Sequence, residues 1–468
     1  MTGSPGLSGP PSSFRSLFSG TLVTLFVLVA AFVGLNFFQG PKLREVIVDT
    51  GSIASASNQR IRLVANQSLA QVRDQQIQIS PAAEFRATTS GTILDITLTA
   101  PLKFATDYTV TVTEVKSRFN DQDAEFTHKF RTPGSTVAFL DRADPASEPG
   151  GNDVIRGVAI PDGDPVDLYR ALGIQQFARV GPSLLVVTAS EAGGGAIDLV
   201  APDGITTERL LLPVAGEVGE LQPSSTVGLV AFTITSEIAD PLPRQSTVLY
   251  AVDLGGDHVV RAVTGLNGAP LEILDFVVIP GGTLAAAQAS DESVSLVDLT
   301  GVSPAVPVGQ FTTLRGVSPE GSQLLVGDIY GAVTLELADG TQSRLEQVPL
   351  DGEQPFIGDI HLTDRAGARV QQIVIFDPDA GSFTSAIAWA DNTGARVIYL
   401  TPGDSGSIDD FSVSPNGQYV AVASIPDVSS STTDAAVVDP RSTTITTTIV
   451  DVTTGREVRT VSGFDLEW

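Results

Sequence analysis

The feature that most constrains this chain is a short unit of strands and Pro/Gly turns that recurs through its last two-thirds. Two copies are clearest: Val317–Gly321 followed by Gln323–Val326, and Val413–Gly417 followed by Tyr419–Val422. Each copy places an apolar strand, a Ser-Pro-x-Gly turn and a second apolar strand in succession. Repeats of this length are typical of arrays of small sheets, because one unit cannot bury its apolar face alone.

The spacing of the repeats indicates a ring of four-stranded sheets. The turn after each innermost strand falls at Pro182, Pro223, Pro280, Pro319, Arg365 and Pro415, which lie 39 to 57 residues apart. These spacings bracket the ~40–50 residues of a propeller blade. The chain ends at Gly463–Trp468, which resembles the innermost strand Asp409–Val413 with no blade after it. Pairing this end with Thr136–Arg142 would complete a seventh blade and remove the exposed sheet edges.

The turns of residues 135–468 resemble those of the WD40-like and TolB-like bacterial propellers, whose blades carry a Ser-Pro-Asp-Gly turn. Glu320 and Asn416 stand at the Asp position, and Ile279–Gly282 matches in part. The resemblance implies a β-propeller, and the count of turns makes it a seven-bladed β-propeller; neither says much about function, because one fold carries many functions.

A long apolar segment lies near the N-terminus. Residues 16–41 contain no charged side chain, and a helix of roughly 20 residues crosses the hydrocarbon core of a bilayer. We therefore expect a transmembrane helix over 19–38 after a disordered tail, 1–18. The alternative is a signal peptide cleaved near Val29–Ala31. The uncleaved anchor is favoured because the apolar run continues for seven residues after Ala31.

The flanking charges, Arg15 on one side and Lys42 and Arg44 on the other, differ too little to decide the orientation. A short tail followed by a large acidic body favours the tail inside and the body outside. The expected location is the cell membrane, with a single span and most of the chain extracytoplasmic.

Residues 44–133 show short strands with alternating apolar side chains, best seen at Thr92–Thr99 and Tyr108–Thr113. About seven strands in such a length are typical of a small antiparallel sandwich. Pro101-Leu102, Thr106–Val112 and Phe130–Thr132 resemble bacterial Ig-like domains of surface-layer and cell-wall proteins. The resemblance implies that the Tyr strand and the final Phe strand pack across the core. It also implies a spacer or binding role without catalytic residues.

Charge is distributed unevenly along the chain. Residues 134–468 contain 15 Arg, no Lys and 44 Asp+Glu, a net charge of −29. Such a body repels phosphate backbones, so nucleic-acid binding is disfavoured. The acidic surface either keeps the protein soluble and prevents its aggregation, or it presents an acidic face to a cationic partner or divalent ions. Cysteine is absent, which excludes thiolate metal sites and cysteine nucleophiles.

The innermost strands of a propeller line its central channel. Polar residues near the start of these strands are Asp275, Arg315, Asp359, His361, Asp409 and Asp410. Clustered carboxylates near one axis can bind a cation; the alternative is that polar residues at a wet channel mouth need no ligand. Asp377–Ser382 has oxygen ligands at alternate positions, but it is too short for a calcium loop and fits a hairpin turn.

Four long loops are expected on one face of the propeller. They are Asp141–Asp153, Ala189–Gly195, Ser236–Ser246 and Ile425–Arg441. Long loops on a rigid scaffold are a usual place for binding, so this face is the expected surface for a protein or small-ligand partner.

The sequence contains no nucleophile elbow, phosphate loop, dinucleotide fingerprint or metal-ligand spacing. We therefore predict no catalytic residues, metal or cofactor, and a membrane-anchored extracytoplasmic binding or scaffold protein. The alternative is a hydrolase or lyase at the channel mouth, using Asp275, Asp359 or Asp410 with or without a divalent ion. A third possibility is a cell-envelope component that recognises glycans, for which the 6% of aromatic residues gives little support.

Overall fold

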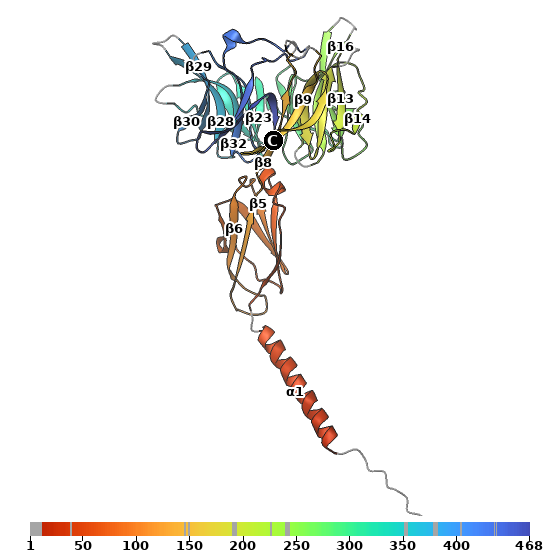
Figure 1. Cartoon of the computed structure of the whole chain (residues 1–468), viewed down its shortest axis with the longest axis vertical. Helices are drawn as coiled ribbons and strands as arrows, with labels where there is room; N and C mark the ends of the chain where they lie inside the picture. Colours follow the sequence, from red (N-terminus) through yellow and green to blue (C-terminus); the bar gives the residue numbers. More distant parts are fainter. Residues whose placement is uncertain are drawn as a thin grey trace, which may run out of the picture. The chain divides into compact units, whose positions relative to one another are not determined.

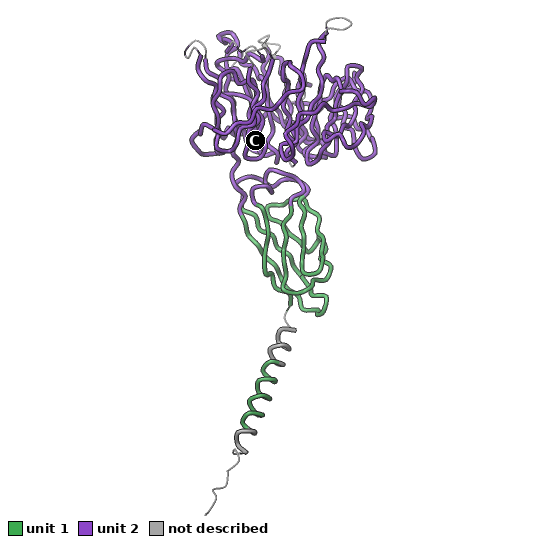
Figure 2. Tube along the Cα trace, turned by 90° about the vertical axis from the view of Figure 1, so that its right-hand side faces the viewer, with its two compact units in different colours: residues 1–49, 60–98, 107–130 green, residues 50–59, 99–106, 131–468 purple. Residues whose placement is uncertain are grey.

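The structure is a computed structural model that describes residues 12–37, 40–144, 147, 150–189, 194–224, 227–238, 244–350, 354–377, 382–402, 405–434, 436 and 438–468. Its contacts divide the chain into two compact units, coloured separately in Figure 2. Unit 1 holds residues 1–49, 60–98 and 107–130. Unit 2 holds residues 50–59, 99–106 and 131–468.

The N-terminal helix α1 spans Ser12–Phe37, and its described side chains, such as Leu22 and Phe26, are exposed. Among the described residues, no helix has both the length and the hydropathy needed to cross a membrane. The predicted span 19–38 lies partly outside these residues, as do the side chains at 30–37 and most of the predicted tail 1–18.

Unit 1 is built of seven strands in two antiparallel sheets. One sheet has the order β1 (Leu43–Ile47), β2 (Arg60–Ala65), β5 (Ile93–Leu98) and β4 (Phe85–Ser90). The other has the order β3 (Ile77–Ser80), β6 (Asp107–Val115) and β7 (Ala124–Arg131), with the 3-10 turn η1 (Asp74–Gln76) before β3. Apolar side chains alternate inward, and Leu94, Ile96, Val110 and Val112 are fully buried.

The expectation that the Tyr and Phe strands pack across the core of unit 1 is wrong. β6 and β7 are neighbours in the same sheet, because a short connection turns the chain straight back on itself. Tyr108 and Phe130 still contact each other, with ring centroids 5.8 Å apart, as side chains on adjacent strands do.

Unit 2 contains seven four-stranded antiparallel sheets, an all-β arrangement typical of a propeller (Figure 1). The first sheet combines three strands that follow Arg131 with the C-terminal strand, in the order β10 (Val166–Ala171), β9 (Asp153–Ile160), β8 (Ser135–Asp141) and β35 (Phe464–Glu467). The second is β11 (Ile174–Val180), β12 (Ser183–Ala189), β13 (Gly195–Val200) and β14 (Thr207–Arg209). The third is β15 (Glu217–Pro223), β16 (Leu229–Ile238), β17 (Arg244–Asp253) and β18 (Arg261–Ala262).

Four further sheets repeat the same order along the chain. The fourth is β19 (Asp275–Val278), β20 (Leu284–Gln288), β21 (Ser293–Asp298) and β22 (Val306–Gln310). The fifth is β23 (Thr313–Val317), β24 (Gln323–Asp328), β25 (Gly331–Glu336) and β26 (Gln342–Arg344). The sixth is β27 (Phe356–Leu362), β28 (Arg369–Asp377), β29 (Ser382–Ala390) and β30 (Ala395–Leu400). The seventh is β31 (Ser407–Val413), β32 (Tyr419–Ile425), β33 (Thr446–Asp451) and β34 (Arg456–Ser462).

In the two sheets that contain it, the Ser-Pro-x-Gly turn closes the hairpin between the first two strands. Ser318 Oγ accepts a hydrogen bond from Gln323 N at 3.1 Å, and Ser414 Oγ accepts one from Tyr419 N at 2.9 Å. Both serines are buried, so these bonds satisfy groups that water cannot reach. The glycines four positions into the turns have φ of +74° and +65°, which favours glycine.

The C-terminal strand completes the first sheet. Phe464 pairs with Leu140 and Glu467 with Ala138, so β35 lies beside β8, as the sequence predicts for Gly463–Trp468 and Thr136–Arg142. Phe464 and Leu466 are buried, which indicates that the end of the chain is part of the core.

Glutamines join successive sheets through their innermost strands. Gln176 Nε2 on β11 donates to Gly219 O of β15 at 2.9 Å, and its Oε1 accepts from Leu221 N at 3.1 Å. Gln222 on β15 holds β19 in the same two-sided way, through Phe276 O and Val278 N. The side-chain amide of each glutamine thereby bonds one C=O and one N–H group of the next innermost strand, so that these buried polar groups have partners.

Two segments of unit 2, residues 50–59 and 99–106, pack against the hairpin turn that contains Pro415. The first of them includes α2 (Ser52–Ser55). Phe104 N donates to Gln418 Oε1 at 2.7 Å, and Asn416 Nδ2 donates to Leu102 O at 2.9 Å. The ring of Phe104 stacks on Tyr419 with centroids 6.3 Å apart.

Candidate functional site

The structure places the six predicted channel residues on four innermost strands. Asp275 begins β19, Arg315 lies in β23, Asp359 and His361 lie in β27, and Asp409 and Asp410 lie in β31. They do not form one cluster. Asp410 lines one cavity, whereas Asp275, Arg315 and His361 line another.

The first cavity, of about 510 Å³, lies at the end of the channel where the innermost strands begin. We call it the acidic mouth. The carboxylates that line it are Glu217, Glu220, Asp410, Asp439, Asp465 and Glu467. Gln175 also lines it, and its buried Oε1 has no hydrogen-bond donor in the described part of the chain.

The second cavity, of about 280 Å³, continues the channel inward and shares Glu220 with the acidic mouth. Asp275 and Asp410 occupy equivalent positions in their strands: each accepts a hydrogen bond from the next residue's N–H at 2.7 Å. Two different innermost strands therefore carry an aspartate at the same position along the channel.

Enclosure of these acids raises their pKa values. Burial is the main cause for Glu220, Asp275 and Asp410, and the charges of neighbouring acids add to it at Glu220 and Asp410. Their side chains are accessible to solvent, yet protein surrounds them on most sides, so the charged form is poorly hydrated.

The two acids of the C-terminal strand are the most perturbed. Burial raises the pKa of Asp465 to about 6, despite the nearby Arg441 and Arg142. Burial and the charge of Asp465 raise the pKa of Glu467 to about 7. Near neutral pH these side chains exchange protons, so their charge responds to any cation that enters the cavity.

Val438, Asp439 and Arg441 of the predicted loop 425–441 line the acidic mouth. This segment contains the 3-10 turn η2 (Val428–Ser430). Arg142 Nη1 pairs with Asp434 at 2.9 Å, with side-chain exposures of 5% and 6%, and also donates to Asp439 O at 2.9 Å. The described part of this segment, blue in Figure 1, lies on the same side of unit 2 as the C-terminal end of β16.

Arg441 is the cation of the acidic mouth. It forms ion pairs with Asp409 and, at 2.7 Å, with Asp439, and it lies 3.9 Å from Asp465. Its guanidinium and that of Arg142 both lie over the ring of Phe464, at 5.5 and 4.9 Å. Asp409 is therefore neutralised by Arg441.

The predicted long loops fall only partly on described residues. Positions 145, 146, 148 and 149, 190–193, 239–243, and 435 and 437 lie outside them. Ser236–Ser246 is not a loop throughout, because β16 continues to Ile238 and β17 begins at Arg244. Most of Asp377–Ser382, the segment compared with a calcium loop, is also outside the described residues.

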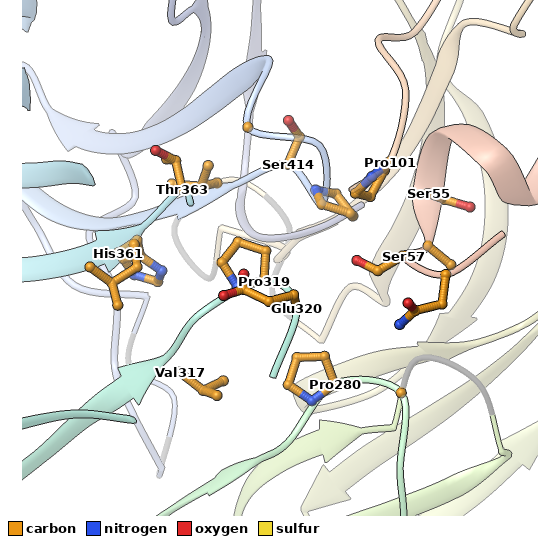
Figure 3. Close-up of a pocket in the computed structure, with 17 residues that line it drawn as sticks. Ser55, Ser57, Pro101, Pro280, Val317, Pro319, Glu320, His361, Thr363 and Ser414 are labelled. Atoms are coloured by element: carbon orange, nitrogen blue, oxygen red, sulfur yellow. The ribbon is translucent and has the colours of Figure 1, made fainter. Parts of the chain in front are cut away.

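His361 lies nearer the opposite end of the channel. Burial lowers its pKa, and its ring meets Phe411 edge-on at 4.8 Å. It lines a cavity of about 260 Å³ where the turns of Pro280, Pro319 and Pro415 converge with Ser55–Asn58 (Figure 3). Within the described residues, no three His, Cys, Asp or Glu side chains are placed to hold a metal ion.

Sequence reasoning missed Glu220, Asp465 and Glu467. A signal for them was present, because Glu217 and Glu220 precede the turn at Pro223, and Asp465 stands in a strand that resembles Asp409–Val413. No local sequence pattern indicates that Arg142 and Arg441 form ion pairs at the acidic mouth, because their partners are distant in the sequence or lie in loops.

No protein-family model matches the chain, and no curated protein sequence is significantly similar to it. Among solved structures, TolB from Acinetobacter baumannii matches 79% of this chain and 81% of its own, with 16% identity and a TM-score of 0.39. AztD from Citrobacter koseri matches 71% and 96%, with 12% identity and a TM-score of 0.38. At these TM-scores the similarities support no argument about function.

Proposed function

We propose that this protein is a membrane-anchored scaffold that binds a cationic ligand or the basic segment of a partner protein outside the cytoplasm. In this proposal the segment 19–38 is the anchor, residues 44–133 form an Ig-like spacer, and residues 135–468 form a closed seven-bladed propeller. The uncharged run 16–41 supports the anchor. The seven sheets and the pairing of β35 with β8 support the closed ring.

The observation that carries the proposal is the crowding of carboxylates in the acidic mouth. Glu220, Asp410, Asp465 and Glu467 line one enclosed space, and each has a raised pKa. Carboxylates that repel each other in a poorly hydrated site hold protons until a cation replaces them. A bound ammonium or guanidinium group would lower these pKa values and release the protons.

Gln175 supports a ligand that donates hydrogen bonds. The residue lines the acidic mouth, and its buried Oε1 accepts no hydrogen bond from the described residues. Buried acceptors without donors are rare in native structures. An N–H group of a ligand could satisfy this oxygen, and a cavity of about 510 Å³ is within the usual size for small-molecule sites.

The test is capture of partners from detergent extracts by the full chain and by a Glu220→Gln/Asp410→Asn variant. The control, Glu237→Gln/Glu457→Gln, removes the same charge from two exposed side chains. We expect basic partners to be retained by the wild type and the control and lost by the first variant, with retention weakening as salt is raised. Equal recovery by both variants would show that the acidic mouth is not the binding site.

A hydrolase or lyase at the same mouth is the second candidate. One observation favours it: Glu467 has a pKa of about 7, and a general acid must keep its proton near the working pH. Turnover of ester or glycoside substrates by the full chain, abolished in Glu467→Gln, would favour this candidate. Metal analysis of the purified chain tests whether a divalent ion takes part.

A further inference from the structure

Unit 2 has a further cavity, which unlike the acidic mouth is lined by several arginines. It has a volume of about 390 Å³ and lies between the sheet β23–β26 and the sheet β27–β30. We call it the arginine pocket because Arg315, Arg344 and Arg369 line it; Tyr330 and Phe356 line it as well, and so does one acid, Glu346. We propose that it binds a small organic anion, a carboxylate carried on a ring. This inference does not depend on the function proposed above.

Arg369 supplies a buried positive charge in the wall of this pocket. Its side chain is 1% exposed, and its three hydrogen bonds go to uncharged acceptors: Gln371 Oε1 at 2.9 Å, Gly367 O at 3.2 Å and Glu346 O at 2.8 Å. No described carboxylate lies within ion-pairing distance of it, although the charge of Asp391 acts on it from farther away. A buried cation without a carboxylate in contact is unfavourable, and a ligand anion in the adjoining space would compensate it.

Arg315 brings a second charge that forms no ion pair with a described carboxylate, although Arg315 also lines the 280 Å³ channel cavity with Glu220 and Asp275. Its Nε donates to Thr313 Oγ1 at 3.3 Å and its Nη1 to Gly358 O at 3.2 Å, and the side chain is exposed. Elsewhere in unit 2 arginines commonly pair with acids, as Arg209 does with Asp198 and Arg244 with Glu272. Two unpaired guanidinium groups at one cavity of a strongly acidic protein are therefore unusual.

The third arginine positions the rim of the pocket. Arg344 is bonded through both terminal nitrogens to Asp328, at 3.1 and 2.6 Å, and its guanidinium lies 5.7 Å from the centre of the Tyr330 ring. Its charge is already balanced. Its contribution is to fix the orientation of Tyr330, since a bidentate pair holds the guanidinium plane.

Two exposed aromatic side chains indicate that the ligand has a flat body. Tyr330 is 79% exposed and Phe356 is 69% exposed. Large apolar groups exposed at the rim of a cavity are typical of binding sites, and their faces stack on aromatic or sugar rings. Together with the two arginines, they fit a ring that bears a carboxylate, either an aromatic acid or a sugar acid.

The test uses the full chain in a mild detergent and two matched pairs of probes, followed by ligand-observed NMR and calorimetry. Benzoate and benzamide have the same ring and differ in charge, as do glucuronate and glucose. We expect one of the two acids to bind at least fivefold more tightly than its neutral partner, and this result identifies the source of the carboxylate. Binding of neither acid, or equal binding of acid and neutral partner, would overturn the proposal.

Variants place the binding in the pocket. Arg315→Ala and Phe356→Ala change exposed side chains and should leave folding intact, and we expect each to weaken binding of the preferred acid at least fivefold. Arg244→Ala removes an exposed arginine outside the pocket and should bind like the wild type. The proposal is wrong if the first two variants also bind like the wild type. The Glu220→Gln/Asp410→Asn variant should retain this binding, which separates the two proposals.

Discussion

Glu467 should make the propeller less stable as the pH rises, and Glu467→Gln should remove this effect. The carboxyl group lies in the acidic mouth beside Asp465, and burial raises its pKa to about 7 from the usual 4.5. A raised pKa means that folding favours the protonated form. The stabilising contribution is therefore complete below pH 4.5 and is lost as the pH rises to 7.

The size of the effect follows from the pKa. A rise from 4.5 to about 7 corresponds to about 3 kcal/mol at pH 8, because each tenfold change in proton affinity is worth about 1.4 kcal/mol. At pH 5 the same relation gives less than about 1 kcal/mol. Since the side chain retains partial contact with channel water, these are upper values. Glutamine keeps the shape and carries no charge.

The assay is urea unfolding of wild type and Glu467→Gln at pH 5 and pH 8. Tryptophan fluorescence reports on the propeller because Trp389 and Trp468 both lie in unit 2. We expect the advantage of the variant to grow by about 2 kcal/mol between the two pH values. Glu457→Gln, at an exposed position on β34, should show no such growth. An advantage that is equal at both pH values, or a variant that is less stable at pH 8, would refute the reasoning.

Three other changes test the packing of unit 2. Arg142→Met should cost about 3–5 kcal/mol in urea unfolding, because it leaves Asp434 buried without its partner; a loss below 1 kcal/mol would contradict this. Phe104→Ala should cost about 3 kcal/mol by the same assay, because Phe104 is buried against Tyr419; an unchanged midpoint would mean that the segment is not docked. Deleting 464–468 should cost about 3–6 kcal/mol and promote aggregation measured by light scattering, because two buried side chains and the partner of β8 are lost; a stable monomer would argue against closure by β35.

Local chemistry explains what could be predicted from the sequence. The turns at Ser318 and Ser414 are visible because serine, proline and glycine act within five residues of each other. Even the degenerate copy at Asp364–Gly367 keeps the hairpin, since Thr363 N donates to Ala368 O at 2.8 Å. The C-terminal strand was also predictable, because it repeats the pattern of an innermost strand.

Interactions between distant residues explain what could not be predicted. Arg142 and Asp434 are separated by 292 positions, so the sequence of Ile425–Arg441 is typical of a polar, flexible loop although a buried ion pair anchors it at Asp434. The prediction that Ser236–Ser246 is a loop was partly wrong for a related reason. Its flanks are polar on both faces, yet the backbone continues to pair strand to strand, as between Ser236 and Ser246.

The two proposed sites depend differently on the charge of the protein as a whole. Residues 134–468 carry a net charge of −29, so their long-range field draws cations toward the acidic mouth and repels an anion approaching the arginine pocket. Salt screens that field beyond about 8–10 Å, but it screens much less the contact between a ligand and the buried Arg369. Raising the salt concentration should therefore slow association at the acidic mouth and speed it at the arginine pocket. Selection of an anion by such a protein has to come from short-range contacts in an enclosed space, which is where the two unpaired guanidinium groups and the exposed rings lie.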